Sequence, residues 1–96
     1  MPITPITSAQ IRAGRALLRW SAADLSRASG VSLPTIKRLE LGQGVPSIGV
    51  ELLAAIQASL EGAGVQFLGE PDRGPGVCLD SSAVALQPRP RGIRKK

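Results

Sequence analysis

Hydrophobic residues recur every three to four positions in two long stretches of the chain, the spacing that places them on one face of an α-helix. The first stretch predicts a helix that Thr7 and Gln10 begin with a capping box and that runs to about Arg19. The second predicts a helix from about 48 to 61. The inward-facing positions are expected to be Ile11, Gly14, Leu17 and Leu18 in the first helix, and Ile48, Leu52, Leu53, Ile56 and Leu60 in the second.

Two shorter helices are predicted between these, from Ser21 to Gly42. Ser21 can cap the first of them, and Asp24 stands three residues later, where an acid can bond back to the cap. Gly30 suits the left-handed backbone of a turn. Trp20, just before the cap, is expected to pack in the core where the first two helices of the chain meet.

The second short helix carries its own start and stop signals. Ser32 can cap it, and Pro34 falls in the first turn, where its missing N–H costs nothing. Ile36 and Leu39 are three residues apart, so they face inward together. Gly42 is expected to end it. The short turn after Gly30, with Val31 behind it, favours a helix-turn-helix over an ordinary helical hairpin.

Two short strands are predicted after the helices, at Val65–Leu68 and Val77–Leu79, joined by the turn-forming sequence GEPDRGPG. The predicted fold is mainly α: a four- to five-helix bundle with a helix-turn-helix, followed by a short C-terminal β-hairpin. Residues 7–64 form the expected DNA-binding domain, 1–6 a flexible arm and 81–96 a basic disordered tail. Because a lone hairpin is marginal in water, residues 65–80 are also an expected dimerisation element.

The segment TSAQIRAGRALLRWSAADLSRASGVSLPTIKRLELGQGVPS, followed by ELLAAIQASLEGAGVQF, resembles the Cro/phage-repressor type of helix-turn-helix, also called the xenobiotic-response-element family. GVQF (64–67) and GPGV (74–77) resemble segments that follow helix four in small bacterial members. The resemblance covers about two-thirds of the chain. It implies a four- or five-helix bundle that binds double-stranded DNA, usually as a homodimer, and regulates transcription. Ala22 and the pair Leu33–Pro34 depart from the family pattern, which often has glutamine at the first position and polar residues at the others.

Charge is distributed unevenly. Residues 1–50 carry six basic and two acidic side chains (+4), residues 51–80 carry one basic and five acidic (−4), and residues 81–96 carry five basic and none acidic (+5), which gives the net +5. Arg12, Arg15 and Arg19 form a basic stripe on the first helix. The two basic segments suit a surface that faces phosphates, and the alternative is a solvated charged surface.

Catalytic and metal-binding patterns are not found in the sequence. The chain has no histidine or tyrosine, its acids are scattered, and Cys78 has no base beside it, so we expect no enzyme, no cofactor and no metal site. Cys78 is expected to behave as a small hydrophobe in a strand. With no signal peptide and no membrane-spanning run, a cytoplasmic location is expected.

We therefore predict a sequence-specific transcriptional regulator that reads the major groove with the helix Ser32–Leu41. Arg38 is the expected contact to guanine, Lys37 a contact to a base or phosphate, and Leu33 a contact to a thymine methyl, beside Pro34. The expected phosphate contacts are Ser32, Thr35, Arg27 and Gln43. The alternatives are a protein-binding module that sequesters a transcription factor through Leu33 and Pro34, and an antitoxin.

Overall fold

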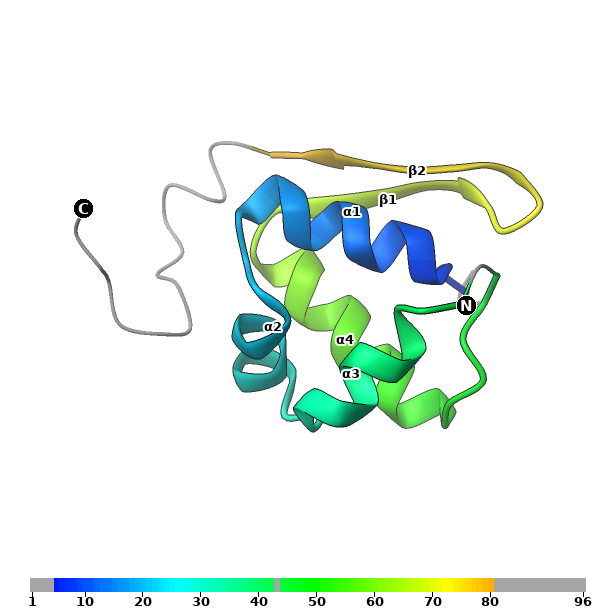
Figure 1. Ribbon diagram of the computed structural model, residues 1–96. Helices are drawn as coiled ribbons and strands as arrows, with labels where there is room; N and C mark the ends of the chain where they lie inside the picture. Colours follow the sequence, from blue (N-terminus) through cyan, green and yellow to red (C-terminus); the bar gives the residue numbers. More distant parts are fainter. Residues whose placement is uncertain (1–4, 43, 81–96) are drawn as a thin grey trace.

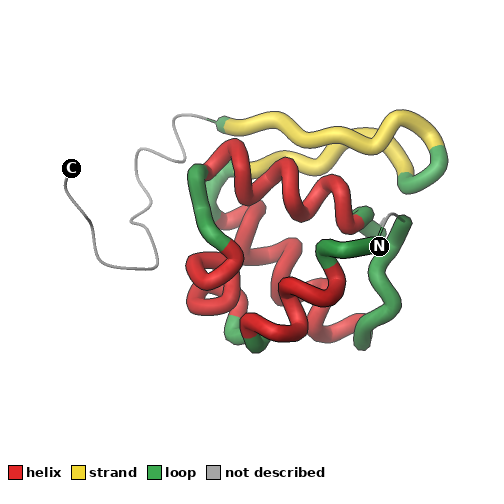
Figure 2. The backbone as a smooth tube through the Cα atoms, viewed as in Figure 1, coloured by secondary structure: helices red, strands yellow, loops and turns green. Residues whose placement is uncertain are grey.

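A computed structural model describes residues 5–42 and 44–80 of the chain. This part forms four helices and a two-stranded antiparallel sheet, with the hairpin lying along one side of the helices (Figures 1 and 2). The mainly helical fold with a C-terminal hairpin is confirmed. The elements are α1 (Ser8–Leu18), α2 (Ala22–Ser29), α3 (Leu33–Leu39), α4 (Val50–Gly62), β1 (Val65–Glu70) and β2 (Arg73–Leu79).

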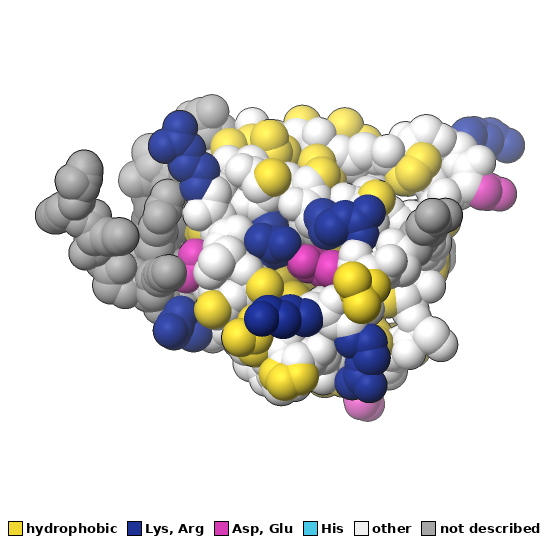
Figure 3. Space-filling model, viewed as in Figure 1, with side chains coloured by type: hydrophobic (Ala, Val, Ile, Leu, Met, Phe, Trp, Pro, Cys, Tyr) yellow, Lys and Arg dark blue, Asp and Glu magenta, His cyan; other side chains and the backbone are white. Residues whose placement is uncertain are grey.

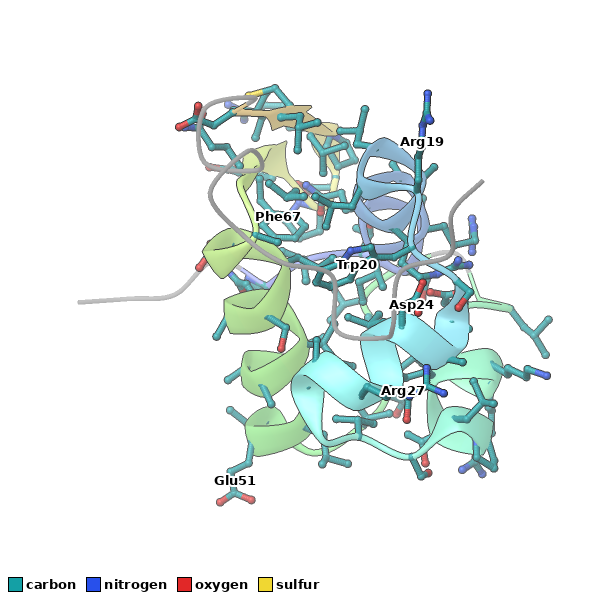
Figure 4. All side chains as sticks on the ribbon, turned by 90° about the vertical axis from the view of Figure 1, so that its left-hand side faces the viewer. Arg19, Trp20, Asp24, Arg27, Glu51 and Phe67 are labelled. Atoms are coloured by element: carbon teal, nitrogen blue, oxygen red, sulfur yellow. The ribbon has the colours of Figure 1, made fainter. Side chains whose placement is uncertain are left out.

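One hydrophobic core joins all four helices to β1. Its centre is made of side chains with no exposed surface, one or two from each helix. Trp20 is 7% exposed, and Figure 4 shows it between α1 and α2 on one side and α4 on the other. The predicted core position of Trp20 is therefore confirmed. The fully covered residues are Ile11, Leu25, Ile36, Ile56 and Leu60.

Helix α1 ties the hairpin to the bundle. Its N-cap is the predicted capping box, in which the Gln10 N–H donates to Thr7 Oγ1 and the Thr7 N–H donates to Gln10 Oε1. The amide nitrogen of Gln10 then donates to the carbonyls of Leu68 (3.1 Å) and Gly76 (2.9 Å), one on each strand. At Gly14 an added Cβ would lie 3.3 Å from a methyl of Val65, so the helix and β1 are in close contact.

The strands are longer than predicted because the turn sequence itself pairs. Glu70 lies opposite Arg73, and Pro71 with Asp72 makes the tip of the hairpin. The register shifts between Leu68 and Glu70, where Gly69 has a φ of 74°. A side chain at Gly69 would also meet the Gly74 carbonyl oxygen at 2.1 Å, so only glycine fits there.

Two predicted positions are wrong. Leu17 is 40% and Leu52 42% exposed, although both were expected to face inward. Each lies at the edge of its helix's apolar stripe, where the stripe is wider than the surface that the neighbouring elements cover. Cys78 is exposed on the outer face of the hairpin, because the strand alternation turns its neighbours Val77 and Leu79 inward instead.

The helix boundaries also differ from the prediction. Helix α3 ends at Leu39, three residues before Gly42, and α4 begins at Val50 rather than near Ile48. The connection between the two helices is correspondingly longer than predicted. The predicted arm and tail, 1–6 and 81–96, lie outside the described residues apart from Pro5 and Ile6, of which Ile6 is 2% exposed and belongs to the core. No helix among the described residues is long and apolar enough to cross a membrane.

Candidate nucleic-acid interface

The two helices of the motif begin and end on side-chain hydrogen bonds that their sequence supplies. The Asp24 N–H donates to Ser21 Oγ (3.0 Å) and the Ser21 N–H donates to the Asp24 carboxylate (2.8 Å), so the predicted capping box of α2 is present. Gly30, with a φ of 79°, closes α2, and its N–H donates to the Ser26 carbonyl. Asp in place of the usual Glu therefore still completes the box.

Side chains of α2 fix the turn that follows. Ser26 Oγ donates to the Val31 carbonyl (2.6 Å), and the Val31 N–H donates to Ser29 Oγ (3.1 Å). Ser29 Oγ in turn donates to the Leu25 carbonyl (2.8 Å). The Val31 side chain is 3% exposed. Both main-chain groups of Val31 are thus held by α2, which sets where α3 begins.

Helix α3 presents a short polar face away from the core. Ile36 and Leu39 are 0% and 4% exposed and face inward as predicted. With about 100° between successive residues, Pro34 points opposite them, and Lys37 and Arg38 flank it. These three side chains are exposed, and α3 carries no acidic residue.

The C-terminal end of α3 is fastened to α1. Ser8 Oγ donates to the Leu39 carbonyl (2.6 Å). Arg12 donates to the carbonyls of Glu40 and Gly42. Arg15 binds the Glu40 carboxylate with two hydrogen bonds of 2.8 Å each. We call Ser8, Arg12 and Arg15 of α1, together with Glu40 at the end of α3, the α1–α3 clamp.

The ion pair of the clamp is largely shielded from water. The side chains of Arg15 and Glu40 are 22% and 9% exposed. The hydrogen bond to Glu40 raises the pKa of the Arg15 guanidinium above its ordinary value. Arg15 also donates to the Trp20 carbonyl (2.9 Å), so one side chain joins α1, the start of α2 and the end of α3.

Because of the clamp, most of the predicted basic stripe on α1 is engaged in contacts within the protein. Two of its three arginines bind groups within the protein. The third, Arg19, points outward from the end of the helix in Figure 4. Glu40 was not among the predicted site residues. The signal that could have revealed it is an acid directly after the apolar face of α3, at a position where the chain turns back toward α1.

Basic side chains nevertheless gather on the face that contains α1, α2 and α3. Figure 3 shows lysines and arginines spread over this face with acidic atoms between two of them. Helices α1 to α3 and their caps hold six basic residues against two acidic ones, Asp24 and Glu40. Both acids are buried, at 2% and 9% exposure, so the positive charges dominate the surface that a phosphate backbone would meet.

The predicted phosphate contacts are in different situations. Ser32 Oγ accepts from the Thr35 N–H (3.4 Å) and donates to Thr35 Oγ1 (2.9 Å), so both hydroxyls take part in the cap of α3. Arg27 is 55% exposed and lies 3.7 Å from the Asp24 carboxylate. Gln43 lies outside the described residues.

The predicted base contacts all lie on α3. Leu33 is half-buried at the edge of the polar face, and Pro34 and Lys37 are exposed. Arg38, with Thr35, also borders a hollow of about 530 Å³ between α3, the connection that follows it and the first turn of α4. Among the described residues, no three His, Cys, Asp or Glu side chains gather where they could hold a metal ion.

Comparison with known protein families agrees with this geometry. The model of the helix-turn-helix family matches residues 11–55, from the second turn of α1 to the middle of α4. This segment is therefore similar to the Cro/C1-type helix-turn-helix family, whose members bind DNA and regulate transcription. A comparison with curated proteins found no match.

Proposed function

We propose that the protein is a sequence-specific transcriptional regulator that reads the major groove of double-stranded DNA with α3. The observation that carries the proposal is the outward face of this helix, where Lys37 and Arg38 flank Pro34 with no acid beside them. In helix-turn-helix proteins the second helix of the motif enters the groove with its first residues at the base edges.

Arg38 is the residue that we assign to a guanine. Its planar guanidinium can donate two parallel hydrogen bonds to O6 and N7 in one rigid plane, a geometry that the flexible lysine ammonium lacks. Lys37, on the other side of Pro34, contacts a base or a phosphate, and Leu33 contacts a thymine methyl at the edge of the same face.

Phosphate contacts position the motif without reading sequence. Arg27 can supply one because more than half of its side chain is exposed despite its distance of 3.7 Å to Asp24. Ser32 spends its O–H proton on Thr35 Oγ1, whereas Thr35 accepts that bond and keeps its own O–H to donate to a phosphate. Because neither hydroxyl carries a charge, we expect both to contribute less than Arg27. Gln43 remains a proposed contact on its sequence position alone.

The test is a footprint of the purified protein on the DNA upstream of its own gene at physiological salt. We expect protection of a short site with two related half-sites. Protection that does not depend on sequence, or none at any salt, would contradict the proposal. Competition with random DNA in the same titration separates specific from general electrostatic binding.

A second candidate function is a protein-binding module that sequesters another transcription regulator. The specific observation that favours it is apolar exposure at α3: Pro34 is exposed in the middle of the outward face, and Leu41 is 85% exposed just beyond the helix. Leu33→Asp should then abolish binding to the partner protein, and the wild type should leave no footprint. A footprint confined to one operator would exclude this candidate.

A further inference from the structure

The outer edge of β2 has no neighbouring strand among residues 5–42 and 44–80. The sheet there consists of β1 and β2 alone. Figures 1 and 4 show β2 at the outer border of the molecule, with β1 on the side of α4. We infer that this edge is a dimerisation surface, which pairs antiparallel with the same edge of a second copy of the chain.

The hydrogen-bond pattern of the hairpin shows which groups this edge presents. Directly beyond Leu79, the Asp80 N–H donates to the Gly64 carbonyl (2.8 Å). In an antiparallel ladder, pairs that exchange hydrogen bonds alternate with pairs that do not. Counting back from Asp80, the main-chain N–H and carbonyl groups of Val77 and Leu79 therefore point away from β1. These groups are available to another strand.

Pro75 argues against one register of the pairing. It lies two residues before Val77 and has no N–H to donate. A register that sets Pro75 opposite Leu79 of the second copy would leave that carbonyl of Leu79 without a donor. A register that sets Val77 of each copy opposite Leu79 of the other makes two such pairs. In each pair the two residues donate one N–H and accept one N–H. The twofold axis then passes at Cys78, and the two Cys78 residues face each other as a non-hydrogen-bonded pair.

The side chains of β2 also suit an antiparallel copy. No charge occurs from Gly74 to Leu79, while Arg73 precedes this stretch and Asp80 follows it. Antiparallel pairing brings the basic end of one copy toward the acidic end of the other, whereas parallel pairing would bring like charges together. Val77 and Leu79 are only half-buried in one copy, so their pairing across the axis removes further apolar surface from water.

The resulting dimer keeps both α3 helices on one side. Figures 1 and 4 show α1 and α3 on the same side of the hairpin. The twofold axis of two paired edge strands is perpendicular to the sheet, so it carries α3 of each copy to the same side of the four-stranded sheet. This step alone rests on the proposed function, because a dimer of this kind can present two α3 helices to a palindromic operator.

Cys78 gives a direct test of the register in the natural chain. Facing residues of a non-hydrogen-bonded pair have Cα atoms about 4.5 Å apart, inside the range that a disulfide spans. Diamide, which accepts the two electrons and two protons of a thiol pair, should convert most of the reduced protein to a covalent dimer without any DNA. The measurement is a non-reducing gel at tens of micromolar protein.

A matched control moves the thiol from β2 to the neighbouring strand β1. Gln66 lies opposite Cys78 on β1, on the same exposed face. In the double variant Cys78→Ser/Gln66→Cys the two thiols of the dimer are three strand spacings apart, roughly 14 Å, so no disulfide should form. Cross-linking of the control alone would move the interface to β1, and cross-linking of both proteins would indicate random collision. Cross-linking of neither would also overturn the inference.

A second pair of variants tests the edge without oxidation. Val77→Pro removes an outward N–H but no hydrogen bond to β1, so it should raise the dimer dissociation constant at least tenfold in sedimentation equilibrium. Val77→Thr keeps the N–H and a β-branched side chain and should leave the dimer intact. Circular dichroism of both variants checks that the helices are retained. A monomeric wild type at tens of micromolar, or a Val77→Pro variant that dimerises normally, would contradict the inference whatever the protein's activity on DNA.

Discussion

At the scale of single residues, the outward face of α3 depends on very few side chains. Arg38 and Lys37 are the two cations of a seven-residue helix, and only Arg38 has the planar fork that recognises guanine. The neighbouring candidates Ser32 and Thr35 are joined to each other in the cap. Sequence preference should therefore respond more to Arg38 than to any other residue of the motif.

Arg38→Ala should cost roughly 1–3 kcal/mol on the specific site and relax the base preference at one position. The measurement is a pair of titrations, one with the operator and one with random DNA. Arg73→Ala removes the same charge from the tip of the hairpin, far from α3, and serves as the control. If Arg38→Ala weakens both DNAs equally, Arg38 contacts a phosphate.

Gly69 is a residue whose identity the backbone dictates. Gly69→Ala would place a Cβ 2.1 Å from the Gly74 carbonyl oxygen at a φ of 74°, so we expect a loss of about 2–4 kcal/mol in the free energy of unfolding. Gly76→Ala, on the partner strand with open space around its Cα, should change stability by less than about 0.5 kcal/mol. Urea denaturation of both variants checks this, and equal effects would refute the strain argument.

At the scale of elements, α3 is positioned from both of its ends. The turn holds its start through Ser26 and Val31, and the α1–α3 clamp holds its end through Arg15 and Glu40. A helix of seven residues is too short to be stable alone. Its orientation therefore depends on these contacts and on Ile36 and Leu39 in the core.

Arg15→Ala should lower the free energy of unfolding by about 2 kcal/mol, less than the 3–5 kcal/mol of a fully buried pair because Arg15 is partly exposed. The reason is that Glu40 would keep its charge with little water around it. Glu40→Ala together with Arg15→Ala should cost less than the sum of the single changes, which a double-mutant cycle by denaturation measures. Additive effects would mean that the pair contributes nothing as a pair.

The caps and turns of the motif could be predicted from the sequence, because they depend on residues three or four positions apart. The boxes at Thr7 and Ser21, the turn at Gly30 and the inward pair Ile36 and Leu39 are all confirmed. The α1–α3 clamp could not be predicted from the sequence, because Arg15 and Glu40 are 25 residues apart and only the packed fold brings them together. For the same reason the sequence does not show that two arginines of the basic stripe on α1 bind groups within the protein.

The exposure of side chains at the edge of a helix's apolar stripe also could not be predicted from the sequence. Leu17 has the helical spacing of a core residue, yet it is 40% exposed, since periodicity gives a direction and not the extent of the neighbouring surface. The contacts to DNA stay predictions. One of them, Gln43, lies outside the described residues. The hairpin was predicted too short because turn residues such as Glu70 and Arg73 continue the ladder.

At the scale of the whole molecule, opposite charges occupy different parts of the chain. The described helices α1 to α3, with their caps, carry +4 and residues 44–80 carry −4, so the described part is neutral in sum but polarised. The segment 87–96 holds the remaining five positive charges. General affinity for DNA should therefore depend strongly on that segment even though it lies outside the described residues.

Truncation after Leu86 takes the net charge from +5 to zero. It should weaken binding to specific and random DNA alike and flatten the dependence of affinity on salt, by about 0.9 in the log–log slope for each phosphate that the segment neutralises in the full chain. The melting temperature should hardly change. Titrations at several salt concentrations give the slope, and an unchanged slope and affinity would show that the segment does not touch DNA.

The position of Trp20 has a consequence for how this molecule can be observed. It is the single tryptophan of a chain without tyrosine, and it is buried where α1 and α2 meet, away from the outward face of α3. Its fluorescence therefore reports the state of the core on the natural sequence, with no label attached. Emission that stays constant while DNA is added would mean that the motif docks as a rigid body, whereas a shift would reveal movement between its supporting helices.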